Sequence, residues 1–143
     1  MQTLYSYGTI AVLGTVLFLL PYGTQQDTPA GYVLEHEGEI GVEQPGPHDG
    51  TGTTTGYSFF ANEQDLKFVL RKRVLHRGAS IGYHLQEGHE VYYVLSGTGE
   101  MAMNGKTFPV KAGDAILTRP GSSHGLKQTG NNDLTIFISY QLN

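Results

Sequence analysis

The chain of 143 residues contains no cysteine. It can therefore form no disulfide, thiolate metal site, iron–sulfur cluster or cysteine nucleophile. Basic residues are also few, nine against thirteen acidic ones, and they are scattered apart from Arg71-Lys72-Arg73. Because a nucleic-acid-binding protein needs a broad basic face, we interpret this trio as a solvated strand edge. The absence of a helix-turn-helix segment also argues against DNA regulation, so no nucleic-acid partner is expected.

Charged side chains are missing from residues 1–26, where Ile10 to Leu20 form a run of mostly apolar residues. A run of this length is typical of a secretory signal peptide and is too short to cross a bilayer of about 30 Å. No Lys or Arg precedes the run and no Ala-x-Ala site follows it, so a hydrophobic tail used in packing or assembly is the alternative. We expect export if the segment is a signal and a cytoplasmic location otherwise. Membrane contact is expected only through an uncleaved segment.

Turn-forming residues, in contrast, are abundant. Twenty glycines and nine tyrosines fit short strands and many turns better than a helical bundle. Asn104-Gly105 predicts a type I′ hairpin turn, because both central positions of that turn need positive φ. We find no long helix and no internal repeat, so the strand spacing predicts an all-β sandwich or barrel. The predicted strands are Tyr57–Phe60, Lys67–Leu75, Ser80–Gln86, Val91–Leu95, Glu100–Met103, Lys106–Val110, Ala115–Thr118, His124–Gln128 and Leu134–Gln141.

Residues 27–56 precede these runs and are predicted to be an N-terminal extension with a long loop. A short strand is possible at Gly31–Leu34, and the stretch from Glu43 to Gly56 is rich in Gly, Pro and Thr. Loops of that length are often functional, so His48 and Asp49 either form a lid over a pocket or belong to a plain connector, which we favour. The predicted organisation is a signal or tail over 1–26, the extension over 27–56 and the barrel over 57–143.

Side chains of metal-binding type occur on two successive strand-like runs. His84 and Gln86 are two residues apart, so they face the same side of a strand. A turn over 87–89 can bring Glu90 against them, whereas His89 has the opposite parity and should point outward. His124 follows a Pro-Gly turn on a different strand pair, and it can join the others only if the sheet closes.

Imidazole, carboxylate and amide ligands suit a divalent first-row ion such as Mn, Fe, Ni, Zn or Co. Two imidazoles and one carboxylate leave positions free for water and substrate, as a catalytic metal requires. Tyr92 shares the face of Glu90 and could donate a proton or simply pack. Arg119 could clamp a carboxylate or phosphate, or form a salt bridge at the rim.

On these residues the chain resembles the cupin family over about residues 67–140. The first cupin motif is matched by Gly78, His84, Glu90 and Gly97, with Gln86 in place of its second His. The second motif is matched by Gly113, Gly121 and His124, with Arg119 in place of Pro and Gln128 in place of Asn. The resemblance implies a double-stranded β-helix, or jelly-roll, barrel with a flexible N-terminal segment, and a homodimer.

The resemblance also implies one divalent transition metal, with His84, Gln86, Glu90 and His124 as its ligands. The candidate catalytic residues are Glu90, Tyr92 and Arg119. The alternative is a metal-free barrel in which the histidines are core or rim residues and Glu90 pairs with Arg119.

We therefore expect a metal-binding cupin, either a small enzyme of oxygenase or isomerase/epimerase type acting on an oxygen-rich molecule, or a non-catalytic module binding a sugar or organic acid. The residues expected in the core or a dimer interface are Phe68, Leu70, Met101, Met103, Phe108, Ile136 and Ile138.

Overall fold

The computed structural model describes residues 31–142, so the predicted signal or tail at 1–26 lies outside the described residues. Strands dominate the described part, in which the helix α1 (Glu37–Ile40) is a single turn, and the all-β prediction is confirmed. Among these residues no helix has the length and apolar character needed to cross a membrane. The strands are β1 (Gly41–Pro45), β2 (Thr53–Phe59), β3 (Phe68–Leu75), β4 (Ser80–Leu85), β5 (Glu90–Ser96), β6 (Thr98–Met103), β7 (Lys106–Lys111), β8 (Ala115–Thr118), β9 (Ser123–Thr129) and β10 (Leu134–Gln141).

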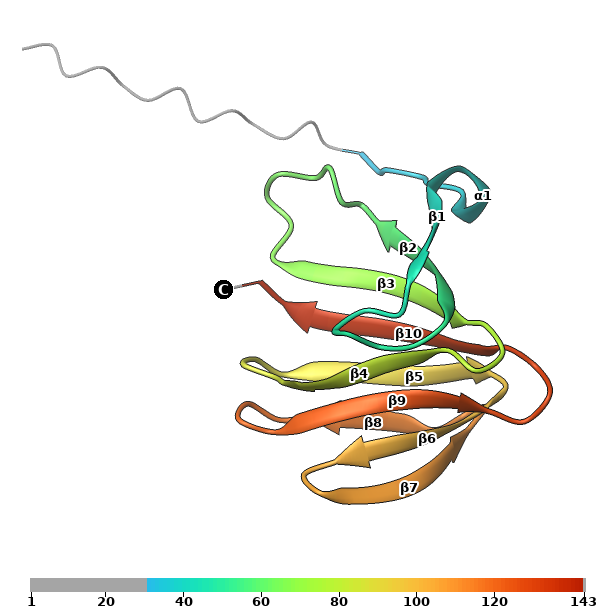
Figure 1. Ribbon diagram of the computed structural model, residues 1–143. Coiled ribbons are helices and arrows are strands. Elements are labelled where there is room, and N and C mark those ends of the chain that lie inside the picture. The colour runs from blue at the N-terminus through green and yellow to red at the C-terminus, as the bar shows by residue number, and fades with distance from the viewer. Residues whose placement is uncertain (1–30, 143) are drawn as a thin grey trace, which may run out of the picture. The chain divides into compact units, whose positions relative to one another are not determined.

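The strands form two antiparallel sheets, one in the order β1-β2-β3-β10-β5-β8 and the other in the order β4-β9-β6-β7 (Figure 1). From β3 onward each strand lies in the opposite sheet from the strand before it, except within the β6–β7 hairpin. The inner faces of the two sheets share one core, with Leu75, Leu134 and Ile136 from the larger sheet and Met101 and Leu126 from the smaller. The predicted jelly-roll barrel is confirmed.

The β6–β7 turn has the predicted geometry. Asn104 has φ 49° and Gly105 has φ 77°, the two positive values that a type I′ turn requires. Asparagine tolerates this conformation better than most residues because its short polar side chain can bond locally.

The loop predicted between Glu43 and Gly56 is shorter than expected, and the correction adds a strand. β1 pairs with β2 from Gly41–Tyr57 to Pro45–Thr53, which leaves only residues 46–52 as a connection. Pro45 is tolerated because β1 is an edge strand, where every second backbone N–H points away from the sheet and needs no strand partner. The short strand considered at Gly31–Leu34 does not form.

On β3 the two arginines face the interior of the barrel, whereas charged side chains usually face solvent. Ile136 and Ile138 lie in the core, and their partners across the β3–β10 pairing are Arg73 and Arg71. Paired residues share a face, so both guanidinium groups point into the barrel, and Arg73 is only 7% exposed. The predicted solvated edge is therefore wrong for both arginines. Lys72 faces outward, where it pairs with Glu37.

The predicted core is correct for the β6 and β10 residues, since Met101, Ile136 and Ile138 are buried. Phe68 lies on the outer face of β3 and is exposed. Phe108 pairs with the buried Met101 and so shares its face, but it is exposed because β7 is the edge strand of the smaller sheet. Neither phenylalanine is therefore buried in the core, Phe68 because of its face and Phe108 because of its edge position.

Candidate metal centre

Three metal-binding side chains converge between the two sheets. His84 on β4 lies directly opposite His124 on β9 in the strand pairing, and Glu90 begins β5 in the facing sheet. One ligand atom from each of these residues lies within 4.8 Å of the other two. The barrel thus brings together two imidazoles and a carboxylate, as the strand parity predicts.

The His84 ring is held by its own strand. Its Nδ1–H donates to the carbonyl oxygen of Gly82 at 2.8 Å. A histidine fixed in this way presents Nε2 as a lone-pair donor, which is the usual arrangement of a metal-ligating imidazole.

Glu90 and His124 are both buried and in contact, with Glu90 Oε2 3.1 Å from His124 Nε2. Nevertheless, among the described residues neither Glu90 Oε2 nor His124 Nδ1 has a hydrogen-bond partner of good geometry. A buried carboxylate oxygen without a donor is costly, and a cation in the cluster would offset that cost. The residues present therefore fit a metal ion.

Tyr92 completes the buried part of the cluster. Its hydroxyl lies 3.1 Å from His124 Nε2, and the side chain is 3% exposed. Burial, and then the negative charge of Glu90, raise the pKa of the Tyr92 phenol well above its usual value. The phenol is thus held protonated, so it can donate a hydrogen bond but is a poor base.

The remaining predicted residues lie around this cluster. Gln86 is half-buried, and its backbone is hydrogen-bonded to Ser122 and Gly121. Its role as a metal ligand stays a prediction. Arg119 is exposed in the turn before β9, and no ion pair joins it to Glu90 in the described part of the chain. The alternative in which those two residues pair is therefore not what the structure shows. His89 is exposed, as its parity predicts.

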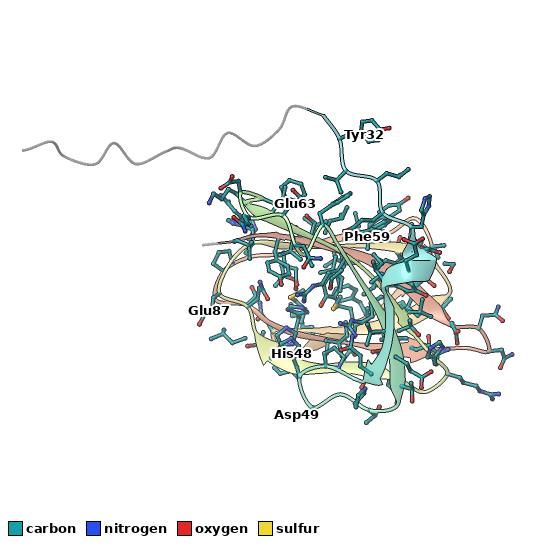
Figure 2. All side chains as sticks on the ribbon, turned by 90° about the horizontal axis from the view of Figure 1, so that it is seen from above. Tyr32, His48, Asp49, Phe59, Glu63 and Glu87 are labelled. Carbon is teal, nitrogen blue, oxygen red and sulfur yellow. The ribbon has the colours of Figure 1, made fainter. Side chains whose placement is uncertain are left out.

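A third imidazole lies against the cluster, from a segment that sequence reasoning treated as a connector. The His48 ring stacks on His84 with centroids 3.6 Å apart and planes 4° from parallel. Burial, and then the neighbouring His84, lower the pKa of His48. Figure 2 shows His48 and Asp49 side by side in the loop at the rim of the barrel. We call residues 46–52 the strap.

The strap is attached along β4, the edge strand of the smaller sheet. The amide of Gly82 donates to the Pro47 carbonyl, and the amide of Ser80 donates to the Thr51 carbonyl, both at 2.9 Å. A Cβ at Gly82 would overlap the His48 carbonyl oxygen, so only glycine allows this approach. In the sequence, the one sign of this contact is Gly82 inside a predicted strand, because a glycine there often marks the close approach of another backbone.

The backbone of the strap is itself unusual. His48 and Asp49 both have positive φ, 54° and 59°. Non-glycine residues adopt this conformation at a cost that the surrounding structure must offset. Here the hydrogen bonds to β4 hold the strained turn in place, with the imidazole over His84.

Comparison with known proteins identifies the family. The cupin domain model matches residues 72–140. The chain is 39% identical to an oxalate-binding protein of Thermotoga maritima, and the match covers 50% of this chain and 70% of that protein. This chain belongs to the cupin family.

Solved structures agree with this cupin assignment. A Thermotoga maritima protein described as a predicted oxalate decarboxylase superposes with a TM-score of 0.71 at 32% identity, over 78% of this chain and all of that one. A polyketide cyclase from Streptomyces resistomycificus superposes with a TM-score of 0.65 over 79% of this chain and 81% of its own, but at 21% identity it supports the fold alone.

Proposed function

We propose that this cupin binds one divalent transition metal through His84, Glu90 and His124 and holds a small organic acid there. The observation that carries the proposal is the buried Glu90 Oε2, which lacks a donor and faces two imidazoles within ligand distance. An acid as ligand is supported by the 39% identical relative that is named for binding oxalate. A bound metal would polarise an oxygen of such an acid.

Further protein groups can join these three ligands while a position stays open for water or the acid. Several first-row ions take more than four ligands, which leaves room for both. Gln86 stands where the cupin motif has a second His, and it would add an amide oxygen. His48 would add an imidazole from outside both motifs, because its ring already lies on that of His84.

The leading form of the proposal is an enzyme, of oxygenase or isomerase/epimerase type. Tyr92 supports it, because a buried protonated phenol in contact with His124 can donate a hydrogen bond to a developing negative charge. The second candidate is a non-catalytic binding module, which the oxalate-binding relative supports by its name.

Elemental analysis of protein purified without chelators tests the metal. We expect about one equivalent of a first-row metal in the wild type, and loss of that metal in His84→Ala and His124→Ala. The matched control is His89→Ala, because His89 is exposed one residue from Glu90. A wild type that carries no metal and takes up none of Mn, Fe, Co, Ni or Zn on titration contradicts the proposal.

Turnover separates the two candidates. The metal-loaded protein is incubated with oxalate and other small acids, and both thermal stabilisation and product formation are measured. Stabilisation with product supports the enzyme, and stabilisation without product supports the binding module.

We also propose a homodimer through the outer face of the larger sheet. Val91, Tyr93 and Leu95 of β5 and Leu117 of β8 project from this face and are each at least 40% exposed. Contiguous exposed apolar side chains typically mark an interaction surface. Tyr93→Lys should shift the mass measured by light scattering toward the monomer, whereas Leu85→Lys on the smaller sheet should not. A wild type that is monomeric at high concentration excludes the dimer.

A further inference from the structure

A second group of polar side chains inside the barrel has no ligand assigned to it. Arg71 and Arg73 both point inward from β3, and Arg73 is 7% exposed. Each guanidinium carries five N–H donors. Within residues 31–142, Arg73 makes one side-chain hydrogen bond, to Thr54 Oγ1 at 2.8 Å, and Arg71 makes none.

These cations also lack a counter-charge. The acidic group on the same inner face is Glu90, and it contacts His124 rather than either arginine. In the described part of the chain no ion pair involves Arg71 or Arg73. Burial, and then the charge of Arg71, lower the pKa of Arg73. Arg73 is buried and Arg71 is half-buried, and a desolvated cation is costly unless it is paired. An anion that reaches this pair would therefore be stabilised.

A cavity leads to Arg71. Its volume is about 150 Å³, and its apolar walls include Phe59, Phe60, Leu66 and Leu142. The Arg71 guanidinium lies 5.7 Å from the centre of the Tyr140 ring, and its Nε is buried without a partner. In Figure 2, Phe59 and Glu63, which also line the cavity, lie across the barrel from His48.

The cavity is a built feature of the fold. Ser58 lies directly opposite Arg71 in the β2–β3 pairing and adds a hydroxyl to the lining. Phe60 has φ 57°, a value that aromatic residues rarely adopt, and its amide donates to Glu35 Oε2 at 2.7 Å. Glu63 is exposed at the rim, where water screens its charge.

The strand register connects this cavity with the candidate metal centre. Val69, Tyr140 and Glu90 form one row across β3, β10 and β5. Arg71, Ile138 and Tyr92 form the next row. β3 and β5 are separated by β10, so their backbones lie about 10 Å apart. The side chains of Arg71 and Tyr92 can reach toward each other over this distance.

We infer that this cavity is a binding site for an organic acid with an apolar body, in which Arg71 clamps the carboxylate and Arg73 adds positive charge behind it. Guanidinium binds carboxylate through two parallel hydrogen bonds, and the phenylalanines and leucines take the hydrocarbon part. The inference rests on the proposed function only in placing the acid beside the metal centre. Its carboxylate clamp is separate from the metal ligands.

Benzoate is a suitable probe, because it joins a carboxylate to an apolar ring and binds metals weakly. Its affinity is measured by calorimetry on metal-free protein. We expect binding to wild type, and a loss of about tenfold or more in Arg71→Met, the range for a charged hydrogen-bonded pair. Arg71→Lys should retain part of the affinity, since the charge remains without the fork. Lys106→Met, at an exposed site on β7, should bind as wild type does.

Two analogues test the two halves of the site. Benzamide has the ring without the charge, and acetate has the charge without the ring, so both should bind at least about tenfold more weakly than benzoate. Equal affinity of folded Arg71→Met, Arg71→Lys and wild type for benzoate, or no benzoate binding by wild type, overturns the inference. Protein that takes up metal but does not bind benzoate contradicts this inference and leaves the proposed function standing. Protein that binds benzoate but takes up no metal contradicts the proposed function and supports this inference.

Discussion

The interior of this barrel contains two polar regions, one rich in groups that can bind a cation and the other rich in hydrogen-bond donors that can bind an anion. The first comprises His84, Glu90 and His124, whose lone pairs converge on one point and call for a cation. The second comprises Arg71 and Arg73, for which residues 31–142 supply one side-chain hydrogen bond, to Thr54, and leave Arg71 Nε buried without a partner, so that we infer a site for an anion. Adjacent rows of the same sheet thus keep ligand atoms and positive charge apart, although direct pairing of Glu90 with a guanidinium would have neutralised both.

The separation has a physical cause in the strand register. Glu90 lies in the row of Val69, and the arginines lie in the two rows beyond it. Tyr92 shares the row of Arg71, but its hydroxyl is directed toward His124, and burial raises the pKa of its phenol. Incompletely paired polar groups in a barrel interior cost stability, and such a cost is typical of functional sites.

The largest effect should come from breaking the first region alone. Glu90→Gln removes the one carboxylate of the proposed metal centre. We expect the affinity for Co²⁺, followed by its visible absorption, to fall by about 100-fold or more, since loss of an outer partner alone costs 10–100-fold. Affinity for benzoate should stay within about twofold. A parallel loss of both affinities would show that the two regions are one site.

Detaching the strap should have the next largest effect. Gly82→Ala places a methyl group against the His48 carbonyl, and we expect the free energy of unfolding to fall by about 2 kcal/mol, as overpacking does. The matched control is Gly88→Ala, where nothing lies within 4 Å of the added carbon and φ is not positive. Urea denaturation measures both. Equal stability of the two variants would mean that the strap is not held against β4 in solution.

Removing the strap imidazole tests whether it belongs to the metal centre. If His48 is a ligand, His48→Ala should weaken Co²⁺ binding by about tenfold, or 1.4 kcal/mol, and should change the visible spectrum of the bound ion. His36→Ala is the control, because His36 is exposed at the N-terminus of α1. An unchanged spectrum and affinity would leave His48 as a cover over His84 and not a ligand.

The smallest effect should be a gain. Arg73→Met replaces a buried unpaired cation by a hydrocarbon chain of similar length, and we expect the free energy of unfolding to rise by about 1 kcal/mol. The lost bond to Thr54 offsets part of this gain. Metal content should not change. A variant less stable than wild type would indicate that the role of Arg73 is to stabilise β2 through Thr54, and not to attract an anion.

The strand parity was sufficient to predict the first region, because strands have a fixed period of two and a barrel has one inside. It placed His84 and Glu90 inward and His89 outward, as the structure has them. The same reasoning failed on β3, where apolar Phe68 and Leu70 alternate with Arg71 and Arg73. Charges normally mark the outer face, so the pattern suggested the wrong side.

The sequence by itself determined an all-β barrel, its hairpin turn at Asn104 and the inward set of two imidazoles and a carboxylate, since local periodicity and turn chemistry act over a few residues. Only the tertiary structure decided that Ile136 and Ile138 pair with Arg73 and Arg71, and that the strap lies along β4 with His48 over His84. These contacts join residues 29 to 67 positions apart. Which strands meet at such a distance depends on how the whole core packs, and no local pattern encodes it.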